Sequence, residues 1–367
     1  MIKKRFWGFG YAICIIIFGL ILWRFVQGAP DKIQSQTRFL MDTFFTIQVP
    51  GDIEVLKDIE KAFVRIEEID KKFNALNPQS PVYKFNNEDI PITDNEIVEL
   101  VKKALEISIK SEGKYDITIF QLVELWGFFN KSPKVPSKEE LDNALNIVSY
   151  NNIYIEKGEL KKKKESTKID LGSIAKGYAL NEAKHILEQS GITSALIDGG
   201  GDIYALGAYN NQPWVIGIMN PRGEGVVGSL ELEDMAVVTS GDYERIFEEE
   251  GKQYHHILDP STGYPAEGLA SVTVISPDPT SADAWATAFF VLGKEKTLEL
   301  LKQLNSIEVF LITDEGENIY SKGMQVYNCA CFDVNCYNEY YRTPFARTSL
   351  QLRFLQKRKL LKGCSLM

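Results

Sequence analysis

Residues 168–202 read KIDLGSIAKGYALNEAKHILEQSGITSALIDGGGD, and this stretch decides the fold class. A strand ends at Ile169, a helix covers about residues 175–189, and a β-rich run at 194–197 leads into a glycine turn. Further β-rich runs follow at residues 214–219, 236–239, 270–275 and 308–312, with one more helix at about 282–304. Strands separated by turns and only occasional helices favour mixed or antiparallel sheets over a doubly wound sheet. The sequence therefore predicts an α+β fold with flanking helices.

The region before this stretch predicts a strand and two helices. Residues 37–49 are rich in β-branched and aromatic side chains and predict a strand. Residues 55–73 carry apolar side chains three and four apart, which predicts an amphipathic helix. Thr93 and Glu96 predict a capping box at the start of the second helix. Residues 161–164 predict a charged turn, and the glycines of residues 198–202 lack dinucleotide-binding spacing.

The amino-terminal residues predict a membrane segment. Lys3, Lys4 and Arg5 precede an apolar run at residues 6–26, which is about as long as a bilayer-spanning helix. Basic residues before such a run favour an amino terminus inside the cell and a following chain outside the cytoplasm. We expect residues 1–28 to be a cell-membrane anchor; the alternative is a cleaved signal segment ending near Gly28 and Ala29. Residues 29–36 then form a linker, 37–326 the folded domain, and 327–367 an atypical basic tail containing cysteines.

Charge and cysteine content exclude some functions. A net charge of -9 with three histidines argues against nucleic-acid binding, which requires basic faces that neutralise phosphates. No cysteine occurs between Cys14 and Cys329, so the central region offers neither a disulfide framework nor a thiolate metal site. An anionic ligand would therefore need local cations or a bound metal.

The segment SADAWATAFF, residues 281–290, offers oxygen ligands on a helix. Asp283 and Thr287 are four residues apart and project from the same helix face. A carboxylate and a hydroxyl suit magnesium, Mg²⁺, which prefers hard oxygen donors. The alternative is structural: Ser281 caps the helix, Asp283 complements its dipole and Thr287 bonds back to the main chain.

Two further segments carry polar residues at structural junctions. Asp170, Ser173 and Lys176 lie where a strand meets a helix, and helix amino termini bind phosphates through free amides; the alternative is a capped helix with an exposed lysine. His255 and His256 precede the rigid turn of ILDPSTGYP, where a histidine can act as a base near neutral pH. The alternative for this pair is a histidine satisfied by main-chain hydrogen bonds.

An aromatic segment completes the set of candidates. Tyr115, Asp116 and Thr118 precede LVELWGF, residues 122–128, a dense apolar patch. Flat ligands such as isoalloxazine or adenine favour such surroundings, although a plain hydrophobic core is the alternative. From the residues alone, the inference extends to a phosphate-bearing ligand bound with magnesium.

An ordered set of motifs adds a family resemblance over about residues 37–324. The motifs are MDTFF, KYDITIF with LWGF, IDLGSIAKGYAL, LIDGGGDIYALG, VVTSGDYERIF, HHILDPSTGYP and SADAWATAFFVLG. In this order they resemble the ApbE family of FAD:protein FMN transferases. The resemblance implies a single ApbE-like catalytic domain behind the amino-terminal membrane segment. Leu76 departs from it, since many relatives carry an aromatic residue there, and the tail after Met324 is unlike the family ending.

The resemblance also implies ligands and residue roles. FAD would be bound as the substrate, with Mg²⁺ on its pyrophosphate. The metal ligands would be Ser173 through its carbonyl, Asp283 and Thr287, and the catalytic residues His256 and Lys176. The residues lining the flavin nucleotide site would be Met41, Lys114, Tyr115, Asp116, Asp170, Lys176 and Ile257.

The reaction implied by the resemblance is phosphoryl transfer. A threonine or serine hydroxyl of an acceptor protein attacks the FMN phosphorus, and AMP leaves; the acceptors would be electron-transfer proteins. A competing hypothesis is an FAD pyrophosphatase in which water replaces the hydroxyl, giving FMN and AMP. Two hypotheses without turnover are a membrane-anchored flavin-binding protein and a structural anchor protein.

Overall fold

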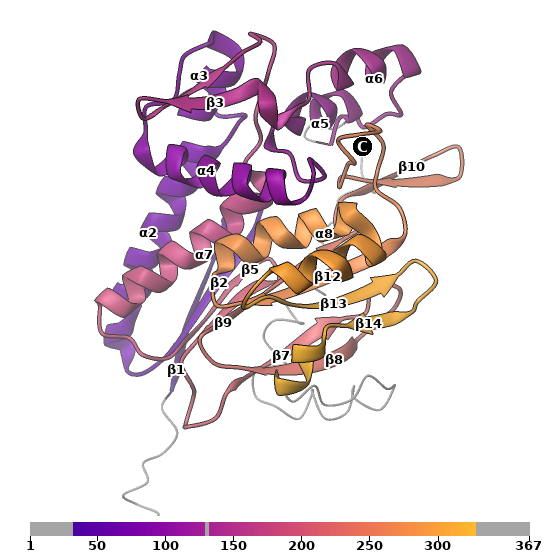
Figure 1. The fold of residues 1–367 in the computed structure, drawn as a ribbon. Coiled ribbons are helices and arrows are strands. Elements are labelled where there is room, and N and C mark those ends of the chain that lie inside the picture. The colour runs from indigo at the N-terminus through magenta and orange to yellow at the C-terminus, as the bar shows by residue number, and fades with distance from the viewer. Residues whose placement is uncertain (1–31, 129–131, 328–367) are drawn as a thin grey trace, which may run out of the picture.

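The computed structural model describes residues 32–128 and 132–327 (Figure 1). The predicted anchor at residues 1–28 and residues 328–367 of the predicted tail lie outside the described residues. No helix within the described ranges is long and apolar enough to cross a membrane.

The strands are β1 Ile33–Leu40, β2 Thr43–Pro50, β3 Ile153–Glu156, β4 Glu159–Lys162, β5 Ala195–Gly199, β6 Asp202–Leu206, β7 Trp214–Met219, β8 Val226–Leu232, β9 Met235–Gly241, β10 Ile246–Glu249, β11 Lys252–His255, β12 Leu269–Ser276, β13 Glu308–Thr313 and β14 Asn318–Tyr320. The α-helices are α2 Leu56–Phe73, α3 Pro81–Glu88, α4 Asn95–Lys110, α5 Phe120–Trp126, α6 Lys138–Leu145, α7 Gly172–Gln189 and α8 Pro279–Leu300. Short 3₁₀ turns are η1 Ile53–Val55, η2 Ile117–Ile119, η3 Tyr150–Asn152, η4 Leu301–Gln303 and η5 Lys322–Tyr327.

One large antiparallel sheet organises the molecule. Eight strands lie in the order β1-β2-β5-β6-β9-β12-β13-β14. Every neighbouring pair is antiparallel. The predicted α+β class with antiparallel strands and flanking helices is therefore confirmed.

The sheet is covered on both faces. Helices α7 and α8 lie across one face, and the β7–β8 hairpin lies against the other (Figure 1). Side chains on neighbouring strand positions point to opposite faces. Val272 and Val274 accordingly join the core under the helices, whereas Ile275 joins the smaller core with Trp214 of β7. Because both faces are covered, all of β12 is buried.

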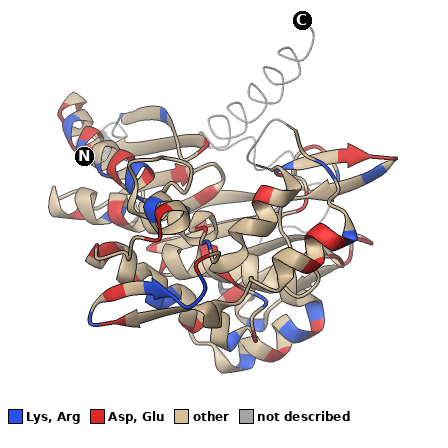
Figure 2. Cartoon of the chain, turned by 90° about the horizontal axis from the view of Figure 1, so that it is seen from above, with Lys and Arg blue, Asp and Glu red and all other residues tan. Residues whose placement is uncertain are grey.

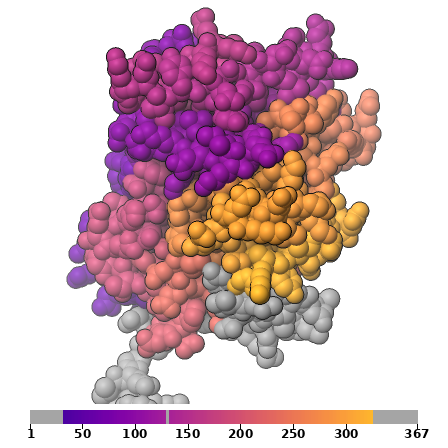
Figure 3. Space-filling model, viewed as in Figure 1, coloured from indigo at the N-terminus to yellow at the C-terminus, as the bar shows by residue number. Residues whose placement is uncertain are grey.

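The amino-terminal helices form a second layer of the structure. In the space-filling view, the indigo to magenta part of the chain packs directly on the orange α8 region (Figure 3). Seen from above, positions of acidic and of basic residues are interspersed along the helices and hairpins (Figure 2).

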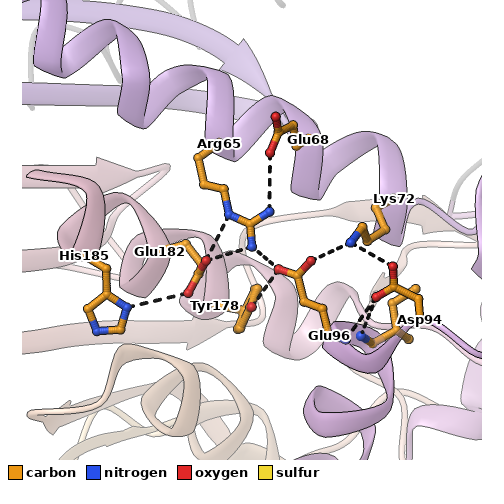
Figure 4. A network of polar contacts seen from close by, with 9 residues as sticks. Arg65, Glu68, Lys72, Asp94, Glu96, Tyr178, Glu182 and His185 are labelled. Atoms are coloured by element: carbon orange, nitrogen blue, oxygen red, sulfur yellow. Dashed lines mark hydrogen bonds and ion pairs between the residues drawn. The ribbon is translucent and has the colours of Figure 1, made fainter. Parts of the chain in front are cut away.

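A polar network joins α2, α4 and α7 (Figure 4). Arg65 of α2 pairs with Glu96 of α4 and, at 2.7 Å, with Glu182 of α7. Lys72 contacts Glu96 at 2.6 Å, and the hydroxyl of Tyr178 donates to Glu96 at 2.7 Å. The network consists of charged side chains and Tyr178. Its ion pairs hold α7 against the layer of amino-terminal helices.

Three local expectations are wrong. Residues 37–49 form parts of two strands instead of one, because Met41 and Asp42 turn the chain at φ 51° and 59°. Asp94 caps α4 in place of Thr93, accepting hydrogen bonds from the main-chain amides of Glu96 and Ile97. The predicted charged turn at residues 161–164 begins inside β4, whose partner strand is β3.

Candidate active site

The site is built where α7 crosses α8. At Gly177 of α7, an added Cβ would overlap the Pro279 carbonyl oxygen and lie 2.7 Å from Cβ of Asp283. Glycine is therefore required for this close approach. The Gly177 amide donates to Asp283 Oδ2 at 2.8 Å. In a regular helix that amide points at the Ser173 carbonyl, so the crossing places the Asp283 carboxylate beside this carbonyl.

Lys176 joins two carboxylates at this crossing. Its ammonium donates to Asp202 and lies 3.6 Å from Asp283 Oδ1. Burial alone would lower the pKa of Lys176, but attraction to Asp202 and Asp283 outweighs burial and raises it. The Lys176 side chain is therefore a firmly held positive charge.

Asp283 is short of positive charge despite this contact. Its side chain is 3% exposed. Burial raises the pKa of Asp283 to about 6; Lys176 opposes the shift and Asp202 adds to it. Two buried carboxylates sharing one ammonium make a local surplus of negative charge, which favours binding of a cation.

Asp202 is a site residue that the sequence pattern did not reveal. It follows the tight turn of Gly200 and Gly201, whose φ values are 74° and 103°. Its second oxygen accepts the Thr239 amide of β9 at 3.2 Å. The glycines are typical of a simple turn, so the only signal in the sequence is an acidic residue directly after them.

Hydroxyl groups surround the carboxylates. Thr287 lies one helical turn after Asp283, and its Oγ1 is 3.4 Å from Ser240 Oγ of β9. Ser173 Oγ donates to the hydroxyl of Tyr115 at 3.1 Å. Burial raises the pKa of Tyr115, so its hydroxyl stays protonated. The predicted residues Ser173, Asp283, Thr287 and Tyr115 are thus gathered around the start of α7 and α8.

The oxygen donors fit Mg²⁺. The Asp283 carboxylate, the Thr287 hydroxyl and the Ser173 carbonyl are all hard ligands. Within the described ranges, no three His, Cys, Asp or Glu side chains cluster as a metal site. The proposed donors include one such side chain, Asp283; the other two are a hydroxyl and a main-chain carbonyl.

His255 and His256 differ in the hydrogen bonds that their rings make. Nδ1 of His255 accepts the Ile257 amide at 3.3 Å, so its Nε2 carries the proton and donates to the Ala266 carbonyl at 2.9 Å. His255 is thus satisfied by the main chain. Nδ1 of His256 is buried and has no hydrogen-bond partner within the described residues.

The protonation of His256 is also set by its surroundings. Burial lowers the pKa of His256 to about 3, and the charges of Arg245, His255 and Lys176 add to the shift. The ring is therefore neutral near pH 7, and in the free protein it is a weaker base than an ordinary histidine. The pKa near 6.5 assumed from the sequence is too high, because the fold removes the ring from water.

Lys114 and Asp116 each bind other segments of the protein in this structure. Lys114 Nζ contacts Asp259 Oδ2 at 2.7 Å and Ser261 Oγ at 2.8 Å, which ties it to the turn after His256. Asp116 accepts hydrogen bonds from Thr118 and from the Tyr150 amide. Both predicted nucleotide-site residues thus support the walls of the site through protein contacts.

The remaining predicted residues occupy the edges of the site. The Asp170 amide donates to the Ile117 carbonyl at 2.7 Å, which brings Asp170 beside the Tyr115 segment. Met41 lies in the β1–β2 turn, where its amide donates to Asp70 at 3.1 Å. Ile257 is buried directly after His256.

Two cavities lie near these residues. One of about 530 Å³ is lined by Asp242, His255, Asp259 and Tyr264, among others. Another of about 670 Å³ is lined by polar network residues and Thr280 of α8. Neither is lined by Lys176, Asp202 or Asp283. We therefore place the candidate chemistry at the cluster of Lys176, Asp202 and Asp283, whose charges are paired, and not at either cavity.

The fold and the site define an α+β protein with an enzyme-type cluster of buried ionisable groups. The sequence pattern of the ApbE family matches residues 41–311. This chain belongs to the ApbE family.

Relatives and solved structures agree with this assignment. FAD:protein FMN transferase from Haemophilus influenzae is 34% identical over 78% of this chain and 88% of its own length. The protein of the same name from Treponema pallidum is 32% identical over 71% and 78%. The ApbE protein of Thermotoga maritima matches with a TM-score of 0.76 at 35% identity, covering 81% of this chain and 99% of its own. Flavin transferase ApbE from Vibrio cholerae matches with a TM-score of 0.73 at 28% identity, covering 81% and 100%.

Proposed function

We propose that this protein is an FAD:protein FMN transferase that moves the FMN half of FAD to a threonine or serine hydroxyl of an acceptor protein. AMP is the other product, and the reaction depends on Mg²⁺. The observation that carries the proposal is the Lys176, Asp202 and Asp283 cluster beside the neutral ring of His256. The names of the aligned relatives support the same activity.

The metal would be held by Asp283, Thr287 and the Ser173 carbonyl. When bound there, Mg²⁺ supplies charge neutralisation for pyrophosphate oxygens. The raised pKa of Asp283 supports this assignment, because a cation would relieve the unfavourable ionisation of that buried carboxylate.

The residues of the chain position the reactants. Met41, Tyr115, Asp170 and Ile257 line the flavin nucleotide, and Lys114 and Asp116 fix the surrounding segments. Lys176 keeps its proton and presents positive charge to the phosphates. Catalysis of this kind rests mainly on positioning and electrostatic stabilisation.

One bond forms at the FMN phosphorus for each bond that breaks there. A bond forms between the acceptor hydroxyl oxygen and the FMN phosphorus, and the bond from that phosphorus to the bridging oxygen breaks. AMP leaves with the bridging oxygen and its electron pair. His256 takes the hydroxyl proton. Its ring is neutral but has a pKa of about 3 in the free protein, so the negative charge of the bound pyrophosphate has to raise that pKa for the transfer.

The site of action is proposed from the sequence. Residues 1–28 would anchor the chain in the cell membrane and place the catalytic domain outside the cytoplasm, because basic residues precede the apolar run. The acceptors would be electron-transfer proteins at the same membrane face. Resistance to alkaline extraction and digestion of the domain by protease added outside the cell would support this placement; release by alkali would contradict it.

The activity test follows AMP with and without an acceptor. Full-length protein is incubated with FAD and Mg²⁺, and AMP is measured while the acceptor mass is recorded. A transferase gives AMP equal to the FMN gained by the acceptor. AMP without labelling, also seen when acceptor is omitted, would indicate FAD pyrophosphatase activity. FAD binding without AMP would indicate a flavin-binding protein.

A further inference from the structure

Arg245 lies between two parts of the candidate nucleotide site. It directly precedes β10, and its carbonyl accepts the His256 amide at 3.2 Å. Its guanidinium Nη2 lies 3.8 Å from Asp42 Oδ2, in the same β1–β2 turn as Met41. The residue therefore bridges the β1–β2 turn and the hairpin that carries the histidines.

The charge of Arg245 acts on the interior of the site. Burial raises the pKa of Asp170, and the Arg245 charge opposes that shift. Burial and then Arg245 lower the pKa of His256. The guanidinium thus influences both His256 and Asp170, which directly precedes Leu171 at the start of α7.

Arg245 is also uncommitted. Of the four arginines within residues 32–128 and 132–327, the other three make hydrogen bonds to carboxylates. Arg222, for example, binds both oxygens of Asp242, at 2.7 and 2.6 Å. Among the described residues, the Arg245 side chain pairs only with Asp42, at 3.8 Å, and the two side chains are 42% and 70% exposed. Such exposed ion pairs contribute little to the free energy of unfolding.

Lys176, by contrast, is already engaged. Its ammonium serves two buried carboxylates, so the positive charge that it presents to the phosphates is shared with both of them. Arg245 could take a phosphate at the cost of the weak Asp42 contact alone. A planar guanidinium also matches two phosphate oxygens at once.

We propose that Arg245 is a substrate-binding residue that leaves Asp42 and binds a phosphate oxygen of the dinucleotide. The proposal rests on the proposed function and names a residue that recognises the phosphate part of its substrate. It makes the loop between β9 and β10 part of the nucleotide site. Recognition by Arg245 depends on phosphate and is independent of the isoalloxazine ring.

The test compares ligands with and without phosphate. FAD, FMN and riboflavin are titrated by flavin fluorescence against the full-length wild-type, Arg245→Ala and Arg245→Lys proteins. Loss of a hydrogen bond to a charged group predicts a roughly 10- to 100-fold weaker affinity of Arg245→Ala for FAD. We expect FMN to be weakened similarly, riboflavin to be unchanged, and Arg245→Lys to be intermediate because lysine keeps the charge.

Arg38→Ala is the matched control, since Arg38 lies on the edge strand β1 and is paired with Glu60 of α2. Thermal melting checks that each variant is folded. Wild-type affinity of Arg245→Ala for FAD, or equal weakening of riboflavin, would overturn the proposal. Wild-type protein that binds FAD without turning it over would contradict only the transferase activity. Wild-type protein that binds no FAD would overturn both.

Discussion

Lys176 separates two carboxylates that would otherwise repel each other. Asp202 comes from the start of β6 and Asp283 from α8, so the ammonium joins the sheet to a helix. With one positive charge for two negative ones, the cluster is stable and still attracts a cation. The same arrangement therefore serves the fold and the proposed binding of Mg²⁺.

Replacement of Asp202 by alanine should be strongly destabilising. The change removes the acceptor of hydrogen bonds from Lys176 and from the Thr239 amide, and because Lys176 keeps Asp283 as a partner the cost is roughly 1–3 kcal/mol. The Asp202→Ala free energy of unfolding, measured by urea denaturation, should fall by this amount. Glu188→Ala, at the exposed end of α7, is the control. Equal stability of the two variants would contradict the assigned ion pair.

His256 should make stability depend on pH in a defined direction. Its pKa is about 3 when folded, against 6.5 for an unperturbed histidine, so the unfolded chain binds more protons between these pH values. Its contribution therefore becomes increasingly unfavourable as the pH falls from 6.5 toward 3. Relative to His256→Gln, the wild-type protein should lose unfolding free energy between pH 7 and pH 5, as measured by urea denaturation. A difference that does not change with pH would show that the ring is not buried and neutral.

The sequence predicted the site residues unevenly. The helical spacing of Asp283 and Thr287 indicates possible metal ligands, and the place of Lys176 at a helix start indicates phosphate binding. Both roles stay predictions, and the structure brings Lys176 to 3.6 Å from Asp283. Asp202 escaped because its partner Lys176 is 26 positions away and no local pattern connects them. The resemblance assigns Lys114 to the nucleotide, which stays a prediction; in this structure its ammonium contacts Asp259.

At the scale of elements, the crossing of α7 and α8 is the most demanding contact. Gly177→Ala places a methyl group on the Pro279 carbonyl oxygen, and the helices have to separate. Overpacking of this kind costs about 1–3 kcal/mol. We expect a lower melting temperature and weaker FMN transfer, because Asp283 moves away from α7. Gln189→Ala, on the exposed end of α7, should behave like wild type; equal effects would argue against a tight crossing.

The network of α2, α4 and α7 should lose its contribution in acid. Burial opposes ionisation of Glu96, but hydrogen bonds from Lys72, Tyr178 and Arg65 outweigh it and lower the Glu96 pKa below 4.5. Stability from a lowered carboxyl pKa is present above the unfolded value and lost as the pH falls through the folded value. Glu96→Gln should therefore be destabilising at pH 7 and progressively less so in urea unfolding as the pH falls through the lowered Glu96 pKa. The exposed Glu99→Gln should show little effect at either pH; a pH-independent Glu96→Gln effect would contradict this account.

Most elements followed from local patterns. The buried strands near residues 214–219 and 270–275 and the helix at 55–73 have periodic apolar residues, and the structure has them there. The β1–β2 hairpin was missed because its turn contains Met41 and Asp42 and no glycine. Both residues have left-handed main-chain conformations. Hairpin turns with such conformations usually contain Asn-Gly or Asp-Gly, which identifies them in a sequence.

At the scale of the whole molecule, the site depends on contacts between distant segments. Strands β6 and β9 supply Asp202 and Ser240, and helices α7 and α8 supply Lys176 and Asp283. The α+β class could be predicted from the alternation of strands and helices. The strand order could not, because pairing partners far apart in the sequence leave no local signal.

The most direct measurement is the intact mass of an acceptor protein after incubation with the enzyme, FAD and Mg²⁺. We expect the acceptor to gain the mass of one phosphoester-linked FMN on a threonine or serine, with one AMP released per label. The gain should disappear with chelator and fall at least about 100-fold in Asp283→Asn, since that change removes a charge from the transition-state surroundings. An unmodified acceptor alongside intact FAD, or full labelling by Asp283→Asn, would contradict the account.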